Sequence, residues 1–240
     1  SFDGRIRKFN LCGEVIEQLD LGNDIWQFAP TGMTAVDYSG DGLLDLAVMG
    51  YIRLHALDVG YVMFALDGNF RVIDKQVLTM GIPSVLDPSM AVFGDIDGDD
   101  DLETIVSFHD ANYGYVSAWH SDRTPVVPNQ PIGGLLGTTL HPGMCAMPLL
   151  ADVDGNGVAE ALCSTGRDLF GTFPRQRVEA FDATGGSVPG WPLFVAPHSQ
   201  EQLTRPNVPV YGDLDSDGDM DMIMITPNDE LVFTSFDQIP

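Results

Sequence analysis

Four short acidic segments recur along this chain at a nearly constant interval, and no other sequence feature constrains the fold as strongly. They begin at Asp37, Asp95, Asp152 and Asp213, which lie 58, 57 and 61 residues apart. Each segment has oxygen-bearing side chains at its first, third and fifth positions and an acid at its ninth. A short, mostly apolar run follows every ninth position. This period predicts four structural units of about 60 residues that together fill the chain.

Each acidic segment has the composition of a loop that wraps around a hard cation. Oxygen side chains alternate with other residues, and a glycine at the sixth position of three segments allows a sharp backbone turn. The carbonyl of the seventh residue can then face inward, and the acid at the ninth position closes the cage. Oxygen ligands at about 2.3–2.6 Å suit Ca²⁺, whereas Mg²⁺ requires a tighter octahedron. We therefore expect up to four Ca²⁺ ions, one per repeat.

The predicted ligands occupy positions one, three, five, seven and nine of each segment, and position seven acts through its backbone carbonyl. They are Asp37, Ser39, Asp41, Leu43, Asp45, Asp95, Asp97, Asp99, Asp101, Glu103, Asp152, Asp154, Asn156, Val158, Glu160, Asp213, Asp215, Asp217, Asp219 and Asp221. We expect the fourth segment to bind calcium most tightly and the third to follow. Ser39 is a weaker ligand in the first segment, and Asp100 replaces the turn glycine in the second.

Two alternative interpretations of the acidic segments are a polar turn without a metal and an EF-hand. Aspartate and glycine populate turns for conformational reasons alone, but four such segments at one period, each closed by an acid, favour calcium. An EF-hand requires glutamate at position twelve and a helix on both sides. Position twelve is instead Val48, Val106, Cys163 or Met224, and the flanking runs are short and often β-branched, which is typical of strands.

A second recurring pattern follows each acidic segment: an apolar strand, a polar residue, a turn and a further strand. Residues 62–68 and 178–185 are examples, and Trp119 occupies the same place in its unit as Leu66 and Phe181. The sequence therefore predicts an all-β fold, a β-propeller of four-stranded antiparallel blades with about four blades in this chain. We expect one propeller domain over residues 1–240, with repeat units at about 12–68, 69–122, 123–185 and 186–240, and with residues 1–11 as the outer strand that completes the last blade.

The acidic loops and the strands that follow them resemble the calcium-binding FG-GAP repeats of integrin alpha-chain propellers and of their secreted bacterial relatives. The run Ser187-Val-Pro-Gly-Trp191-Pro is similar to bacterial members especially. The Phe-Gly…Gly-Ala-Pro element of the family is absent, and the chain has material for four blades where the family usually has seven. The resemblance implies metal loops between the first two strands of each blade, an extracellular location, and a role in binding or scaffolding.

The charge of the chain excludes some partners. The 35 acidic and 11 basic residues give a net charge of −24, which excludes nucleic acid as a natural partner because phosphate backbones require basic surfaces. The four segments hold 17 of the 35 acids, and four divalent cations would reduce the net charge from −24 to −16. No apolar run is long enough to insert into a membrane. The chain starts at Ser1 without a signal sequence, as a mature secreted protein or an excised fragment would, and we expect an extracellular or cell-surface location.

The sequence shows no familiar catalytic motif. The five histidines do not recur at one repeat position, and bound calcium would keep the loop carboxylates ionised, which makes them poor acid–base catalysts. His109 beside Asp110 could act as a general base, but a surface loop is the simpler interpretation. A glycosidase that uses two carboxylates stays open, because their separation is a three-dimensional quantity. We expect no enzymatic activity and no catalytic residue.

The tryptophans and two of the cysteines leave alternatives open. Trp26, Trp119 and Trp191 could stack on sugars in a lectin-like site, but we expect them to pack in the core or at blade edges, with Trp191 more exposed. Cys145 and Cys163 flank the third acidic segment and could form a cross-strand disulfide, although we favour two buried thiols.

The function that we expect is an extracellular β-propeller module for binding or adhesion, which is stabilised by structural Ca²⁺ and recognises a protein or a glycan. One alternative is an ancillary propeller domain of a secreted polysaccharide-degrading enzyme. Another is a structural subunit of a surface assembly, with self-assembly if the ring is incomplete. The binding faces of such folds are loops whose chemistry varies on a constant scaffold, so the repeats do not identify the ligand.

Overall fold

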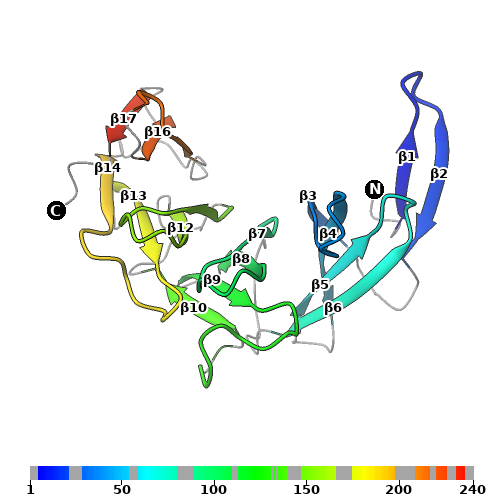
Figure 1. Ribbon diagram of the computed structural model, residues 1–240, viewed down its shortest axis with the longest axis horizontal. Helices are drawn as coiled ribbons and strands as arrows, with labels where there is room; N and C mark the ends of the chain where they lie inside the picture. Colours follow the sequence, from blue (N-terminus) through cyan, green and yellow to red (C-terminus); the bar gives the residue numbers. More distant parts are fainter. Residues whose placement is uncertain are drawn as a thin grey trace. The chain divides into compact units, whose positions relative to one another are not determined.

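The structure is a computed structural model. It describes residues 5–21, 29–53, 59–79, 89–109, 113–130, 132, 134–139, 147–165, 175–197, 209–216, 220–225 and 231–235. All regular structure in these ranges is β-strand, and every strand pairing is antiparallel (Figure 1). None of these residues belongs to a helix that could cross a membrane.

The strands follow one another along the chain in short steps. They are β1 (Arg5–Phe9), β2 (Val15–Asp20), β3 (Ala29–Val36), β4 (Asp45–Arg53), β5 (Val59–Leu66), β6 (Val72–Thr79), β7 (Val92–Gly94), β8 (Glu103–His109), β9 (Gly114–Trp119), β10 (Leu135–Thr138), β11 (Leu149–Ala151), β12 (Glu160–Thr165), β13 (Arg175–Phe181), β14 (Leu193–Pro197), β15 (Val210–Gly212), β16 (Asp221–Ile225) and β17 (Leu231–Ser235).

Each sheet is a meander in which neighbours in the sequence are neighbours in space. Three sheets have four strands, namely β3–β6, β7–β10 and β11–β14. The strands β15–β17 form a three-stranded sheet, and β1 and β2 form a hairpin. The all-β prediction is confirmed, and so is the four-stranded antiparallel unit for three of the sheets. Closure of these sheets into a propeller stays a prediction.

The inner strands of the sheets are the most deeply buried. Every residue of β8, β9 and β12 is buried, although apolar and polar side chains alternate only in part along them. Both faces of these strands are therefore covered by other parts of the protein. This explains why β-branched and aromatic residues such as Ile105, Val106 and Phe108 follow one another there without the strict alternation of a half-exposed strand.

The chain divides into two compact units, Ser1–Ser84 and Val85–Pro240. In the first unit, the hairpin β1–β2 packs on the sheet β3–β6. Ile6 of β1 belongs to the same buried cluster as Val48 of β4 and as Val62 and Phe64 of β5. The hairpin thus covers one face of this sheet.

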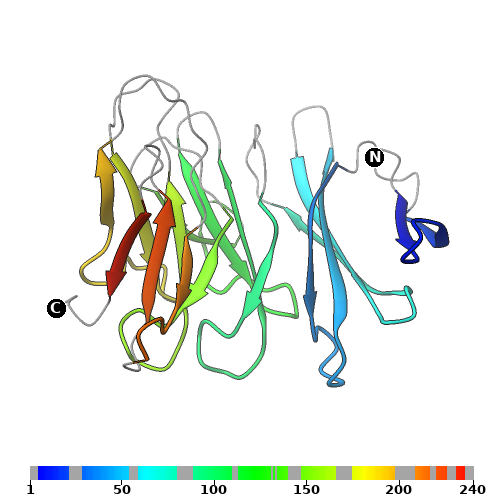
Figure 2. The same cartoon turned by 90° about the horizontal axis from the view of Figure 1, so that it is seen from above.

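In the second unit, three sheets pack face to face in the order of the sequence. Ile105 and Val116 of the sheet β7–β10 share a buried cluster with Ala161 and Phe181 of the sheet β11–β14. On the next interface, Met222 of β16 joins a cluster with residues of β12 and β13. Figure 2 shows these sheets as successive layers in this unit.

The turn between the third and fourth strands of a sheet has one backbone geometry throughout. It begins at Asp67, His120 or Asp182, and the amide of that residue donates to the carbonyl oxygen four residues later at 2.9–3.0 Å. The turn of the hairpin β1–β2 has the same bond, from Asn10 to Glu14 at 2.9 Å. By this pattern the hairpin corresponds to the third and fourth strands of a unit. The unit boundaries, the single domain and the role of residues 1–11 in completing the last blade stay predictions.

The structure settles two of the alternatives that the sequence leaves open. Trp119 and Trp191 are both buried, with 4% and 8% of their surfaces exposed. The expectation of core packing is confirmed for both, and Trp191 is the slightly more exposed of the two although it is also buried. Cys163 is disulfide-bonded, so the favoured interpretation of a buried thiol is wrong for this residue. Cys12 is free, and Cys145 and Trp26 lie outside the described residues.

The interface between the sheets β7–β10 and β11–β14 predicts a sharp effect of adding one methyl group. A Cβ on Gly137 would lie 2.3 Å from Cδ1 of the buried Phe181 ring. Gly137→Ala should therefore lower the free energy of unfolding by about 1–3 kcal/mol, the usual range for overpacking a core. The measurement is urea unfolding followed by fluorescence.

Gly68 supplies the control for this substitution, because a Cβ there meets no atom within 4 Å. Gly68→Ala should change the free energy of unfolding by less than about 0.5 kcal/mol. Equal stability of the two variants would contradict the close packing of these sheets.

Candidate metal centres

The four acidic segments all form the connection between the first two strands of a sheet. They join β3 to β4, β7 to β8, β11 to β12 and β15 to β16. Within the second unit, Figure 2 shows the loops of the sheets β7–β10 and β11–β14 at the same end of their sheets. We name the four connections loops 1 to 4, covering residues 37–45, 95–103, 152–160 and 213–221. In loop 4, residues 217–219 lie outside the described part of the chain.

The sixth position of each described loop has the left-handed backbone that the sequence predicts. The φ angle is +84° at Gly42 and +88° at Gly157. It is +68° at Asp100, where aspartate replaces glycine, and aspartate tolerates this region better than most residues. The chain therefore turns at the same point in loops 1, 2 and 3.

The aspartate at the first position holds the turn together. In loop 3, Oδ1 of Asp152 accepts hydrogen bonds from the amides of Gly155 and Asn156 at 2.8 and 3.1 Å, and its Oδ2 accepts from Gly157 at 2.8 Å. Asp95 accepts four loop amides in the same way in loop 2. Charge-assisted hydrogen bonds of this kind hold the loop in shape without the help of an ion.

The acid at the ninth position is buried in every loop and is the first residue of the second strand. Asp45, Glu103, Glu160 and Asp221 have exposures of 4%, 0%, 2% and 1%. In loops 2, 3 and 4 one carboxylate oxygen accepts the amide of the second loop residue at 2.8–3.0 Å. In loop 1 the corresponding donor is the amide of Ser39 at 2.9 Å.

Three loops bring carboxylates close enough to share one ion. Positions one, three and nine meet in each, with one oxygen atom from every group within 4.8 Å of the others. These clusters are Asp95, Asp97 and Glu103 in loop 2; Asp152, Asp154 and Glu160 in loop 3; and Asp213, Asp215 and Asp221 in loop 4. Oxygens on opposite sides of Ca²⁺ lie about 4.6–5.2 Å apart. The clusters therefore have dimensions that can hold a metal ion.

Loop 1 differs from the other three. Residues 37–45 are all described, and among them no three acidic groups approach one another in this way. The third position is Ser39, so only Asp37, Asp41 and Asp45 could contribute carboxylates. The main-chain bonds of the loop are nevertheless the same, since Asp37 accepts the amides of Asp41 and Gly42 at 3.1 and 2.9 Å.

The side chain at position five accepts a hydrogen bond from the backbone of its own loop. The side chains of Asp41, Asp99 and Asn156 each accept the amide of the residue two positions later, at 2.7–2.9 Å. This bond holds the backbone of position seven, where the sequence predicts a carbonyl ligand at Leu43, Asp101 and Val158. The predicted ligands Asp217 and Asp219 lie outside the described residues.

The buried acid of loop 3 shows the electrostatic cost of this arrangement. Burial is the main reason that the pKa of the Glu160 carboxyl rises from 4.5 to about 7. The neighbouring charges of Asp154 and Asp152 raise it further, and the hydrogen bond from the amide of Val153 acts in the opposite direction. A carboxylate in this position is therefore unstable without a positive charge beside it.

Loop 2 contains the same conflict between burial and hydrogen bonding. Burial raises the pKa of the Glu103 carboxyl, against the amide of Ile96 and the nearby His120. Burial also acts to raise the pKa of Asp95, but the four amides that donate to it outweigh burial and leave the pKa lowered. The amides thus favour the ionised form of Asp95, whereas burial disfavours the ionised form of Glu103.

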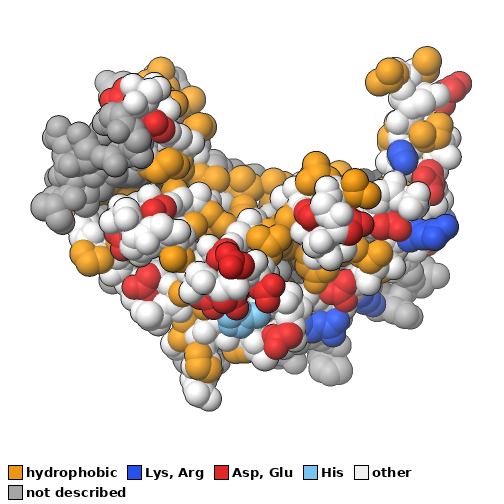
Figure 3. All heavy atoms as spheres, viewed as in Figure 1, with side chains coloured by type: hydrophobic (Ala, Val, Ile, Leu, Met, Phe, Trp, Pro, Cys, Tyr) orange, Lys and Arg blue, Asp and Glu red, His pale blue; other side chains and the backbone are white. Residues whose placement is uncertain are grey.

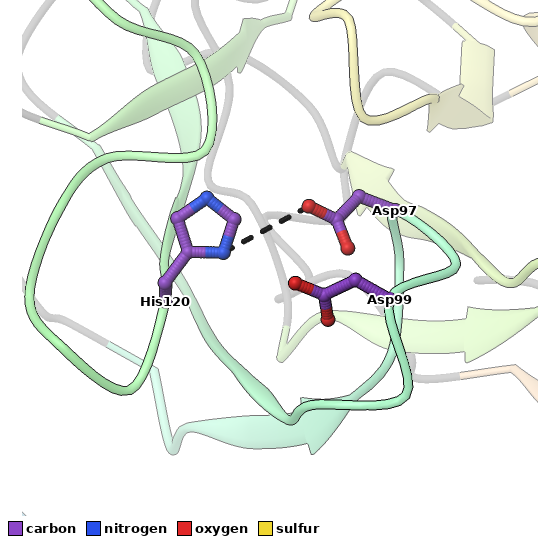
Figure 4. A group of neighbouring side chains, drawn as sticks. All are labelled: Asp97, Asp99 and His120. Carbon is purple, nitrogen blue, oxygen red and sulfur yellow. Dashed lines mark ion pairs between the residues drawn. The ribbon is translucent and has the colours of Figure 1, made fainter.

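The sequence did not identify one residue that lies beside loop 2. His120, in the turn between β9 and β10, lies with Nδ1 3.2 Å from Oε1 of Glu103 and 3.8 Å from Oδ2 of Asp97. Figure 4 shows its ring directed toward the carboxylates of Asp97 and Asp99, and one ligand atom from each of these three residues lies within 4.8 Å of the others. The signal in the sequence is positional, because His120 follows Trp119 where aspartate follows the equivalent residue in the three other units, after Leu66, Phe181 and Phe236.

The other candidate histidine is not at a surface. His109 is the last residue of β8 and only 6% exposed, so the expectation of a surface loop is wrong for it. Asp110, its suggested partner, lies outside the described residues. Figure 3 shows acidic side chains gathered in small groups on the face that it draws, in keeping with clustered rather than evenly spread charge.

The fold and these loops define an antiparallel all-β protein with acidic clusters that can hold metal ions. No model of a known protein family, no curated protein and no solved structure matches the chain.

The raised pKa of Glu160 predicts how stability depends on pH when no metal is present. A carboxyl group whose pKa is higher in the folded than in the unfolded state stabilises the fold at low pH and loses this contribution as pH rises. In the presence of a chelator, the free energy of unfolding should therefore fall between about pH 4.5 and pH 7. Urea unfolding at several pH values measures this.

Glu160→Gln is the matched variant, because the amide oxygen can still accept the bond from Val153 while no charge forms. The fall in stability between these pH values should be smaller in this variant than in the unmodified protein. An identical pH dependence in both proteins would contradict the electrostatic description of loop 3.

Proposed function

We propose that this protein is an extracellular, Ca²⁺-stabilised β-propeller module of the FG-GAP type, which binds a protein or a glycan. The observation that carries the proposal is the common construction of the loops. In loops 2, 3 and 4 a buried ninth-position acid meets the carboxylates of positions one and three at the mouth of two strands. Because the same cluster recurs at the same place in three repeats, we infer that it has the same role, cation binding, in each of them.

Calcium is the cation that these loops suit best. The first, third and ninth positions offer carboxylate oxygens, and the loop can add the carbonyl of position seven and water. Calcium accepts six to eight such ligands in a flexible geometry. Two carboxylates a few ångströms apart repel each other strongly in a poorly hydrated site, and a divalent ion converts this repulsion into attraction. The role of calcium is structural in this proposal.

The arrangement of the sheets supports a propeller. In the second unit, antiparallel meanders pack face to face, and the sheets β7–β10 and β11–β14 carry their equivalent loops at one end. Propeller rings are built from stacked antiparallel meanders of this kind. The ninth-position acid begins the second strand in every one of these sheets. The ring places its variable loops together on one face, where a ligand can bind.

An extracellular location agrees with two observations. Cys163 is disulfide-bonded, and disulfides persist in oxidising compartments. Extracellular calcium is millimolar, and extracellular modules bind calcium with dissociation constants of about 10⁻⁴–10⁻³ M. Loops that share some of their carboxylate oxygens with their own backbone amides would be filled under these conditions.

A variant of one loop tests the role of calcium. Asp154→Asn removes one charge from the cluster of loop 3 and leaves an oxygen that can accept the amide of Asn156. The affinity of one calcium site should fall by at least about tenfold, and the gain in unfolding free energy on adding calcium should shrink. Isothermal titration and urea unfolding, with calcium and with chelator, measure both.

The control is Asp20→Asn, which makes the same change of charge at an exposed residue paired with Arg5 at 3.4 Å in the hairpin β1–β2. It should leave the number and affinity of calcium sites unchanged. Equal calcium binding by both variants and the unmodified protein would contradict the assignment of loop 3.

Binding itself is tested on a glycan array and against extracellular matrix proteins, with the protein in millimolar calcium and then in chelator. The proposal expects a ligand that is bound in calcium, lost on chelation and left chemically unchanged. Depolymerisation of a polysaccharide by the purified chain would instead favour an enzyme or part of one.

A further inference from the structure

Among the loops whose neighbouring turn is described, loop 2 alone lies beside a turn that begins with histidine. In an antiparallel meander, the connection between the first and second strands and the turn between the third and fourth lie at the same end of the sheet. The turn from β9 to β10 therefore approaches loop 2, and its first residue is His120. The equivalent residues are Asp67 in the first unit's sheet and Asp182 in the sheet β11–β14.

The side chains of these two aspartates accept hydrogen bonds from the backbone of their own turns. Oδ1 of Asp67 accepts the amides of Asn69 and Arg71 at 2.9 and 2.8 Å. Oδ1 of Asp182 accepts the amides two and four residues later at 2.8 and 3.0 Å. Asn10 does the same in the hairpin β1–β2, at 2.9 Å for both bonds. The side chain at this position normally caps the turn.

The side chain of His120 does not cap its own turn. Its turn keeps the same backbone bonds, from His120 to Thr124 and from Arg123 to His120, both at 2.9 Å. The capping carboxylate comes instead from Asp122, whose Oδ1 accepts the amide and the hydroxyl of Thr124 at 2.8 and 2.6 Å. The imidazole is thus free to face loop 2, where it is about a quarter exposed.

The ring nitrogen of His120 completes a mixed set of ligands. Nδ1 lies 3.2 Å from Oε1 of Glu103, a side chain with no exposed surface whose Oε2 already accepts the amide of Ile96. Nδ1 also lies 3.8 Å from Oδ2 of Asp97, and one ring nitrogen lies within 4.8 Å of one oxygen each from Asp97 and Asp99 (Figure 4). The imidazole, from a separate turn, therefore groups with the carboxylates of Asp97 and Asp99 and also lies beside the buried carboxylate of Glu103.

This donor set differs in chemistry from those of the other loops. Calcium takes oxygen ligands, whereas imidazole suits first-row transition metals, with Zn²⁺ bound at about 2.0–2.2 Å by nitrogen and carboxylate oxygen. We propose that loop 2 and His120 form a site for a transition-metal dication of the Zn²⁺ class, which displaces calcium from this loop alone. The proposal rests on the premise of the proposed function that the acidic loops hold cations.

The test is a titration of the untagged, full chain with Zn²⁺ in buffer that contains millimolar Ca²⁺, followed by calorimetry. The unmodified protein should bind one Zn²⁺ under these conditions. His120→Asp places at this position the residue that caps two other turns, so the turn should persist. Its affinity for Zn²⁺ should fall by more than about tenfold, and its calcium binding in zinc-free buffer should not fall.

A second readout reports on the nitrogen itself. In protein labelled with ¹⁵N-histidine, Zn²⁺ should shift the imidazole nitrogens of His120, which are identified by their loss in His120→Ala. A merely structural histidine would give no such shift. Unchanged Zn²⁺ affinity in both variants, or no shift at His120, would overturn the proposal. Calcium binding in zinc-free buffer is measured separately, so failure of the proposed function would be seen independently of the zinc result.

Discussion

The structure depends on a buried carboxylate at the start of the second strand of each sheet. Removal of an ionised carboxylate from water is costly unless the charge is compensated. Here one oxygen accepts an amide from the beginning of the loop, and in loops 2, 3 and 4 the group also faces two further acids. The same side chain ties the loop to the strand and creates a site for positive charge.

Because of this connection, the acidic loops affect the stability of the whole repeat. Glu103, Glu160 and Asp221 are the first residues of β8, β12 and β16, which are inner strands of their sheets. These strands contribute Ile105, Leu162 and Met222 to the clusters between sheets. An ion that holds the ninth-position acid therefore acts at the point where the loop meets the core. A ligand of this kind stabilises the folded state according to its concentration relative to its dissociation constant.

Much of this could be predicted from the sequence because the repeat ties chemistry to position. The period of acidic segments gives the loops, and the apolar runs after Asp45, Glu103, Glu160 and Asp221 give the second strands. The left-handed turn at the sixth position follows from glycine in loops 1 and 3, and it forms even at Asp100. Local rules were sufficient for these features.

The features that the sequence could not supply depend on the direction of single side chains. His120 matters because Asp122 takes over the capping of its turn, a substitution that two residues make together. Trp191 is buried because it packs in the same cluster as Met222 of the next sheet, which no local pattern reveals. Cys163 lies within β12, a buried strand that suits a thiol as well as a disulfide, so the sequence favoured the thiol and left the disulfide open.

The central claim is that the repeated loops bind calcium, and native mass spectrometry tests it most directly. The protein is exchanged into millimolar calcium, its mass is measured, and the measurement is repeated after chelation. The account predicts a discrete set of calcium adducts, up to four per chain, that chelation removes, together with a shift toward the broader charge distribution of a less compact chain. A chain that carries no calcium, with the same charge distribution in both buffers, would contradict it.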